Sequence, residues 1–125
     1  MNIVVTGSAG FLGSPLCFDL LSLGHKVIGI DNYITSSDKN TKKLQELFKD
    51  TFNFHKIDLS KDIYDLNEIF RIHKPNCVVH FAALKSVDES EKNSQLYWEN
   101  NLCSTENILN SMKSCNCKKI VYSSS

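Results

Sequence analysis

The chain has 125 residues with 14 Lys+Arg against 14 Asp+Glu, and 42% of its residues are hydrophobic. This length and composition describe one ordinary globular domain with a core of its own, which excludes intrinsic disorder and a collagen-like repeat. The balanced charge disfavours nucleic acid as a partner, because such binding depends on a basic excess.

The first part of the chain predicts a strand, a helix and a second strand. An apolar run over residues 2–6 is too short for a helix and stops at Gly7, so it predicts a strand. Near-helical spacing follows, and Gly24 stands where a left-handed cap is expected; the apolar stripe is Leu16, Leu20 and Leu23. Residues 26–30 supply a second strand rich in β-branched side chains, which completes one βαβ unit.

The middle of the chain repeats this alternation. A short amphipathic helix is predicted by the spacing of Leu44, Leu47 and Phe48, and residues 52–57 predict a third strand. We expect the next helix to be capped at or near Ser60 and to end at Pro75. Its apolar face is predicted to be formed by Ile63, Leu66 and Phe70, with His73 one helical step further.

The last part predicts a fourth strand over residues 77–82, a long helix over 94–115 and a fifth strand over 119–122. The helix carries an apolar stripe of Trp98, Leu102, Leu109 and Met112. Strands that alternate with helices imply parallel pairing with right-handed crossovers and helices on both faces. The predicted fold is therefore a doubly wound, Rossmann-like α/β sheet of five strands, in one domain over residues 1–125.

Ligands of such sheets collect at the carboxyl ends of the strands. The first predicted strand is followed there by three glycines with the spacing G-x-x-G-x-x-G, at Gly7, Gly10 and Gly13. Glycines allow a tight turn and close approach to a pyrophosphate, and the amides that open the next helix favour anions. A plain strand-to-helix turn is the alternative explanation for these glycines.

The second strand is followed by Asp31 and Asn32, at about the 20-residue offset where an acid hydrogen-bonds a ribose 2′-hydroxyl. An acid there favours NAD over NADP, because its charge repels a 2′-phosphate and the one arginine, Arg71, is on a helix. The alternative is that Asp31 only begins a turn. Asp58 follows the third strand, near where an adenine would lie, and the alternative is an acid without a ligand role, because acids are common after strands.

The segment after the fourth strand, His80-Phe81-Ala82-Ala83-Leu84-Lys85-Ser86-Val87-Asp88-Glu89-Ser90, resembles the extended short-chain dehydrogenase/reductase family. Within that family it is similar to the UDP-glucose 4-epimerases, whose signature looks like H-F-A-[AG]-L-K-x-V-x-E-S. The glycine loop, Asp31-Asn32, the run Tyr97-Trp98-Glu99-Asn100-Asn101 and the terminal Tyr122-Ser123-Ser124-Ser125 match the same family in order. The resemblance covers the whole chain, as the amino-terminal part of such a protein.

The resemblance implies NAD as the cofactor, with its pyrophosphate on Gly7, Gly10, Phe11, Leu12 and Gly13. The adenosine half would contact Asp31, Asn32, Thr35, Ser36, Asp58 and Leu59. The nicotinamide ribose would contact Phe81, Ala82, Ala83 and Lys85. Asn100 would reach both the cofactor and the sugar nucleotide, and Ser125 would be the active-site serine.

In this family NAD takes a hydride from C4 of a UDP-hexose and returns it to the opposite face of a 4-keto intermediate. The resemblance also implies a homodimer for the complete protein. The family's Tyr-x-x-x-Lys pair and substrate domain are absent from these 125 residues, so we expect the chain to be inactive alone. The alternatives are another nucleotide-sugar epimerase or dehydratase, suggested by Ala83 and Asp88, and a truncated non-catalytic dinucleotide-binding module.

Several of these residues also have a purely structural interpretation. Lys85 alone would be a solvated loop lysine, and Asn100 a helix-surface residue. His80 is predicted to be a buried strand histidine and Tyr122 a strand residue. The apolar stripe of the long helix is predicted to be core, or in part a dimer-forming surface.

Localisation and metal binding can also be predicted from composition. No stretch approaches the roughly 18 apolar residues of a membrane span, and no charged leader precedes the first strand, so we expect no membrane association and no export. Five cysteines, an odd number among apolar positions, favour the reducing cytoplasm. Cys115 and Cys117 lack a second pair or a nearby histidine, and we predict no metal site.

Overall fold

The computed structural model of the chain describes residues 1–33, 37–81 and 94–123. Strands and helices alternate along it as predicted, and no strand boundary differs from its prediction by more than one residue. The elements are β1 (Asn2–Thr6), α1 (Gly13–Ser22), β2 (Lys26–Asp31), α2 (Lys39–Leu47), β3 (Phe52–Lys56), α3 (Ile63–His73), β4 (Cys77–Phe81), α5 (Ser94–Ser114) and β5 (Ile120–Ser123).

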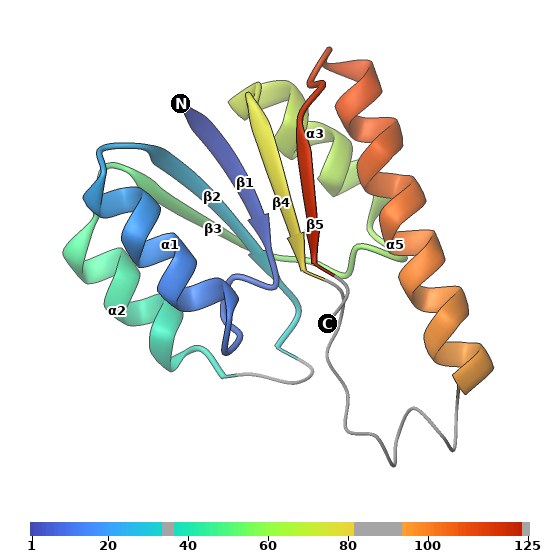
Figure 1. Cartoon of the computed structure of the whole chain (residues 1–125), viewed down its shortest axis with the longest axis horizontal. Helices are drawn as coiled ribbons and strands as arrows, with labels where there is room; N and C mark the ends of the chain where they lie inside the picture. The colour runs from blue at the N-terminus through green and yellow to red at the C-terminus, as the bar shows by residue number, and fades with distance from the viewer. Residues whose placement is uncertain (34–36, 82–93, 124–125) are drawn as a thin grey trace.

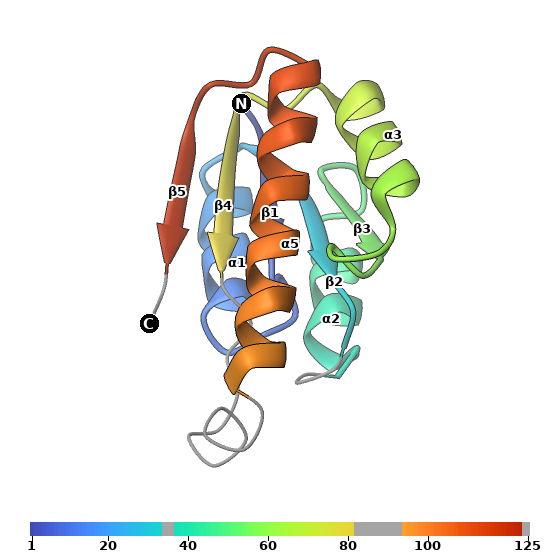
Figure 2. The same ribbon diagram turned by 90° about the vertical axis from the view of Figure 1, so that its right-hand side faces the viewer.

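The strands form one parallel sheet in the order β3-β2-β1-β4-β5, which confirms the doubly wound prediction. Helices α1 and α2 cover one face of the sheet, and α3 and α5 cover the other (Figures 1 and 2). The chain moves outward from β1 in both directions, so the strand order reverses between β1 and β4. Open α/β sheets bind ligands in the crevice at such a reversal.

Two apolar clusters hold the helices onto the sheet. On the α3 and α5 face, side chains from the strands pack against Leu66, Phe70 and Ile108, all three fully buried. On the α1 and α2 face, Cys17 and Leu44 pack against the opposite side of the strands. The central strand β1 contributes to both clusters, because successive side chains of a strand point to opposite faces.

The helix faces differ from the sequence prediction at three positions. Ile63 opens α3 and is 49% exposed, and Ile69 is buried beside Leu66 and Phe70 in its place. On α5 both Leu102 and Leu109 are exposed, whereas Met112 is buried as predicted. The inward face of α5 instead follows Ile108, Ser111 and Met112. Apolar spacing alone did not decide which of two neighbouring stripes meets the sheet.

The helix ends are set by local backbone chemistry. The residue before α3 is Asp62 and not Ser60, and no side chain caps that helix. Its other end follows the prediction, because Lys74 adopts a left-handed conformation (φ 46°) directly before Pro75, where a helical residue is disfavoured. Gly24 takes the predicted left-handed conformation after α1, with φ 94°.

Two negative observations apply to the described part of the chain. Among those residues no helix combines the length and the apolar character that a membrane crossing requires. Likewise, residues 1–33, 37–81 and 94–123 contain no group of three or more His, Cys, Asp or Glu side chains arranged to hold a metal ion.

Candidate functional site

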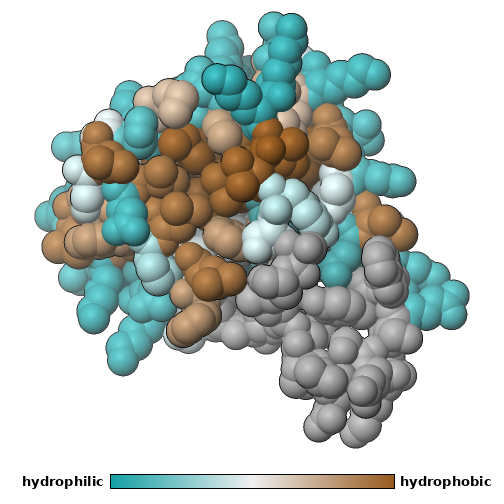
Figure 3. Space-filling model, viewed as in Figure 1, coloured by the Kyte–Doolittle hydropathy of each residue, from teal (hydrophilic) through white to brown (hydrophobic). Residues whose placement is uncertain are grey.

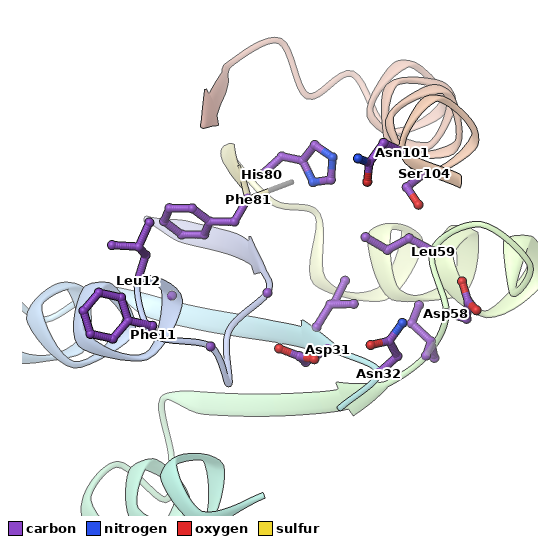
Figure 4. Close-up of a pocket in the computed structure, with 15 residues that line it drawn as sticks. Phe11, Leu12, Asp31, Asn32, Asp58, Leu59, His80, Phe81, Asn101 and Ser104 are labelled. Carbon is purple, nitrogen blue, oxygen red and sulfur yellow. The ribbon is translucent and has the colours of Figure 1, made fainter. Parts of the chain in front are cut away.

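A cavity of about 340 Å³ opens at the carboxyl ends of the strands, beside the reversal of strand order. Figure 4 shows its lining, which comes from the loop after β1, the ends of β2 and β4, the segment after β3, and α5. The lining residues are Gly7, Gly10, Phe11, Leu12, Gly13, Ile30, Asp31, Asn32, Ile57, Asp58, Leu59, His80, Phe81, Asn101 and Ser104.

The loop between β1 and α1 requires glycine at two positions. Gly7 has φ 67°, and a Cβ there would lie 3.3 Å from Phe81 Cβ. A Cβ on Gly13 would lie 2.0 Å from the carbonyl oxygen of Gly7, so only glycine lets the helix begin this close to the strand. The turn is closed by Gly10 N–H, which donates to Gly7 O at 3.1 Å. This compact cradle is what a pyrophosphate-binding loop needs.

The amino end of α1 faces the same cavity. Leu12 precedes the helix, and no side chain hydrogen-bonds to cap it. The first amides of a helix have no intrahelical partner and carry the positive end of its dipole, which attracts anions. Ser14 N–H donates to Gly10 O at 3.1 Å and Leu16 N–H donates to Leu12 O at 3.4 Å, so the helical bonding pattern is present on both sides of Pro15, which has no N–H to donate.

Asp31 connects the glycine loop to the end of β2. Its Oδ2 accepts a hydrogen bond from Ala9 N–H at 3.0 Å, and its Oδ1 accepts one from Tyr33 N–H at 2.8 Å. The second bond makes the turn that sequence analysis left open as an alternative role. Tyr33 adopts a left-handed conformation with φ 63° and stacks on Phe54, with ring centroids 5.3 Å apart. The carboxylate therefore orders the loop and lines the cavity at once.

Asp58 and Leu59 form the wall after β3. The Asp58 carboxylate accepts hydrogen bonds from the backbone and hydroxyl of Ser60, at 2.9 and 2.6 Å, and Asp62 Oδ2 accepts the Asp58 N–H at 2.7 Å. The Leu59 carbonyl accepts a hydrogen bond from the Asn107 side chain at 2.7 Å. The wall is thus held from both α3 and α5.

Helix α5 contributes to the cavity lining two residues that the sequence analysis did not assign to the site. Asn100 is exposed and does not belong to the cavity lining, whereas Asn101 and Ser104 do. The two asparagines are adjacent in sequence, and a step of one residue on a helix turns a side chain by about 100°. Only the docked orientation of the helix distinguishes them.

His80 is buried, as predicted, and it also lines the cavity. Its Nδ1 lies 2.7 Å from Thr6 Oγ1, which also accepts the Phe81 N–H at 3.0 Å. Its Nε2 lies 3.3 Å from Thr105 Oγ1 on α5. Burial lowers the pKa of His80 to about 4, so the ring is neutral at pH 7. Sequence analysis did not assign His80 to the cavity, although its place at a strand end was a signal for it.

Six of the residues that the sequence analysis singled out lie outside the described part of the chain: Thr35, Ser36, Ala82, Ala83, Lys85 and Ser125. The remaining cofactor residues, Asn100 apart, come together in the one cavity. The structure thereby unites the glycine loop with side chains from β2, the segment after β3, and β4, far apart in sequence.

The sheet order, the glycine cradle and the crevice beside it define a Rossmann-like α/β protein of the doubly wound class. Residues 3–125 match the model of the NAD dependent epimerase/dehydratase family. The chain belongs to the NAD-dependent epimerase/dehydratase family.

Curated relatives agree with this family. The chain is 40% identical over 127 residues to UDP-glucose 4-epimerase GEPI48 of Cyamopsis tetragonoloba, covering 99% of this chain and 36% of that protein. It is also 40% identical to the bifunctional protein gal10 of Schizosaccharomyces pombe, covering 98% of this chain and 17% of the relative. The chain therefore spans about a third or less of the length of these relatives.

Solved structures give the same result. A UDP-glucose 4-epimerase from Bifidobacterium longum in complex with NAD+ and UDP superposes with a TM-score of 0.91 at 35% identity, covering 100% of this chain and 37% of that one. The enzyme from Stenotrophomonas maltophila, with bound NAD and formylated UDP-arabinopyranose, has a TM-score of 0.90 at 32% identity, with the same coverage of both chains.

Proposed function

We propose that this chain is the NAD-binding, amino-terminal part of a UDP-glucose 4-epimerase, which interconverts UDP-glucose and UDP-galactose. The observation that carries the proposal is the glycine cradle, in which Gly13 leaves no room for a Cβ against Gly7. The NAD in the Bifidobacterium longum structure supports the same cofactor here. Another nucleotide-sugar epimerase or dehydratase is the second candidate, because the matching family includes both.

NAD supplies a hydride acceptor and donor when it is bound. In our proposal the amides at Phe11, Leu12 and Gly13 hold the pyrophosphate at the amino end of α1, favoured by the helix dipole. Asp31 holds the adenosine ribose with Asn32, and its negative charge disfavours a 2′-phosphate. The wall at Asp58 and Leu59 borders the adenine, and Phe81 borders the nicotinamide ribose.

We further propose that the 125 residues do not catalyse turnover alone. The family's acid/base pair Tyr-x-x-x-Lys does not occur in the sequence, and loss of such a pair removes the proton-transfer path. Ser125 would contribute the active-site serine, Asn100 would contact cofactor and sugar nucleotide, and Thr35, Ser36, Ala82, Ala83 and Lys85 would complete the cofactor contacts.

The proposal also covers the substrate, the location and the oligomeric state of the complete protein. Its substrate would be a UDP-hexose, since the relatives named above are UDP-glucose 4-epimerases. We place it in the cytoplasm, in galactose metabolism, on the strength of its odd cysteine count and these relatives. A homodimer is expected by resemblance.

Calorimetric titration with NAD tests the cradle, using Gly10→Ala and Gly10→Val. Among the described residues, a Cβ on Gly10 would meet Gly7 O at 3.3 Å, a close contact that a small shift of the loop relieves, so the variants should fold while their side chains fill the pyrophosphate space. We expect the valine to weaken NAD binding about tenfold or more, with alanine intermediate. Gly24→Ala is the control, because it strains a left-handed residue away from the cavity and should lower stability without changing NAD affinity.

Two results would contradict the proposal. A folded wild-type chain that binds no NAD, or binds NADP as tightly as NAD, would remove the cofactor assignment. Conversion of UDP-galactose to UDP-glucose by the purified 125-residue chain at a rate typical of enzymes would disprove its inactivity alone.

A further inference from the structure

One buried side chain, His80 of β4, contacts two other elements that surround the cavity, β1 and α5. His80 is 3% exposed and Thr6 is fully buried, and the two are neighbours across the β1–β4 pair. Thr6 directly precedes Gly7, the first glycine of the cradle. His80 directly precedes Phe81, whose Cβ lies so close to Gly7 that a Cβ on Gly7 would be 3.3 Å away. Hydrogen bonds through Thr6 Oγ1 therefore join the ends of both strands at the point where each enters the cavity.

The second ring nitrogen extends this chain to the helix. His80 Nε2 reaches Thr105 Oγ1 at 3.3 Å, and Thr105 follows Ser104 and lies one turn beyond Asn101, both of which line the cavity. Figure 4 shows the His80 ring directed toward the α5 side of the cavity. A neutral imidazole has one donor and one acceptor nitrogen, so it can serve both hydroxyls at once. The ring of Tyr122, on β5, also packs against the His80 ring, with the two centroids 5.4 Å apart.

The two halves of α5 differ in burial, and the His80–Thr105 contact belongs to the less buried half. The half of the helix beyond the cavity is anchored by Ile108, Ser111 and Met112, all buried. Before Ile108, none of the α5 residues whose side chains the structure describes is buried. Of the hydrogen bonds that the described residues of this half make, the His80–Thr105 bond reaches a strand and the Asn107–Leu59 bond reaches the segment after β3.

We propose that His80 is a positioning residue of this cavity, whose two ring nitrogens tie the ends of β1 and β4 to α5 and so set the separation between the glycine cradle and the wall formed by Asn101 and Ser104. The proposal rests on the proposed function, in which that cavity binds NAD. His80 itself acts through Thr6 and Thr105 and is not assigned any contact with the ligand.

The test compares three variants of α5 by NAD titration. Thr105→Val removes the hydroxyl at nearly constant volume, Thr105→Ser keeps it, and Ser111→Ala removes another buried hydroxyl whose partner, Asn67 on α3, is away from the cavity. We expect Thr105→Val to weaken NAD binding about five- to tenfold, the effect of one hydrogen bond. Thr105→Ser should stay close to the wild type. Ser111→Ala should lower the melting temperature but leave NAD affinity unchanged.

Nitrogen NMR of the His80 ring supplies a signature that general destabilisation would not change. In the wild type we expect one neutral tautomer, and in Thr105→Val a shifted Nε2 resonance with Nδ1 little changed. A wild-type ring that averages between tautomers, NAD binding by Thr105→Val equal to that of the wild type, or an equal loss in Ser111→Ala would overturn the positioning role. If the wild type binds no NAD at all, the proposed function fails first and the positioning role with it.

Discussion

At the scale of single residues, Asp31 both orders a loop and lines the cavity. Its carboxylate holds two backbone amides, one in the glycine loop and one in the turn after β2, while it lines the cavity. Each carboxylate oxygen can accept more than one hydrogen bond, so ordering the loop is compatible with contacting a ribose hydroxyl. The two interpretations that the sequence left open are therefore not exclusive.

We expect Asp31→Ala to cost about 1–3 kcal/mol of NAD binding in the complete protein, through loss of a charge-assisted hydrogen bond. Asp31→Asn should lose less affinity for NAD and should reduce the preference for NAD over NADP, because the repelling charge is gone. Calorimetric dissociation constants for both cofactors measure these effects. Asp50→Ala, which removes an exposed carboxylate, is the control. An unchanged NAD dissociation constant in Asp31→Ala would remove Asp31 from the site.

The buried imidazole of His80 predicts acid lability. Its folded-state pKa is lowered by burial from 6.5 to about 4, so between these values the unfolded chain binds more protons than the folded one. Stability from this group is complete above pH 6.5 and is lost as the pH falls toward 4, a difference of roughly 3 kcal/mol in the free energy of unfolding. Burial also lowers the pKa of His55 and of His73, which act in the same direction.

Urea unfolding of the wild type and of His80→Gln at pH 7.5 and pH 4.5 measures this contribution. The wild type should lose more unfolding free energy between the two values than the variant does. His55→Gln serves as the comparison for a half-buried histidine and should change the pH dependence less. Equal pH dependence in the wild type and His80→Gln would show that burial of this ring does not control acid stability.

At the scale of elements, the apolar spacing of α3 predicted most but not all of the residues on its buried face. Leu66 and Phe70 were predicted to share its buried face and do so, but Ile63, the first residue of α3, is 49% exposed. Periodicity identifies the helix and its approximate inward direction.

Phe70→Ala should lower the free energy of unfolding by about 3–5 kcal/mol, because it removes a fully buried ring from the cluster under α3 and α5. Tyr64→Ala is the matched control on the same helix, since Tyr64 is 76% exposed and should change stability by less than about 1 kcal/mol. Chemical denaturation measures both. Similar losses in the two variants would contradict the packing of α3 described above.

At the scale of the molecule, the sheet is covered unevenly. Figure 3 shows apolar side chains gathered across the face seen in Figure 1, where no helix of the described residues lies over β5. β5 is also one of the two edge strands of the sheet that the described residues form, with Val121 57% and Tyr122 48% exposed. An exposed, apolar edge strand invites pairing with another chain.

We therefore expect the 125-residue chain to associate as its concentration rises, as measured by sedimentation velocity. Val121→Lys should reduce the association, because a charged side chain on an edge strand opposes pairing. Leu23→Lys adds the same charge at another exposed apolar position, 74% exposed after α1, and should leave association unchanged. A wild-type chain that remains monomeric at all concentrations would contradict this prediction.

The sequence by itself determined the alternation of strands and helices, the doubly wound class and the glycine loop, because periodicity, turn glycines and crossover handedness are local or topological properties. It also identified Asp31 as a candidate site residue, because a residue at the end of a parallel strand lies at the carboxyl edge of the sheet. Tertiary structure alone decided that Asn101 and not Asn100 lines the cavity, that Ile69 replaces Ile63 in the core, and that His80 connects β1 to α5. Each of these depends on how a helix is rotated and docked on the sheet, and that orientation is set by contacts between residues far apart in the chain.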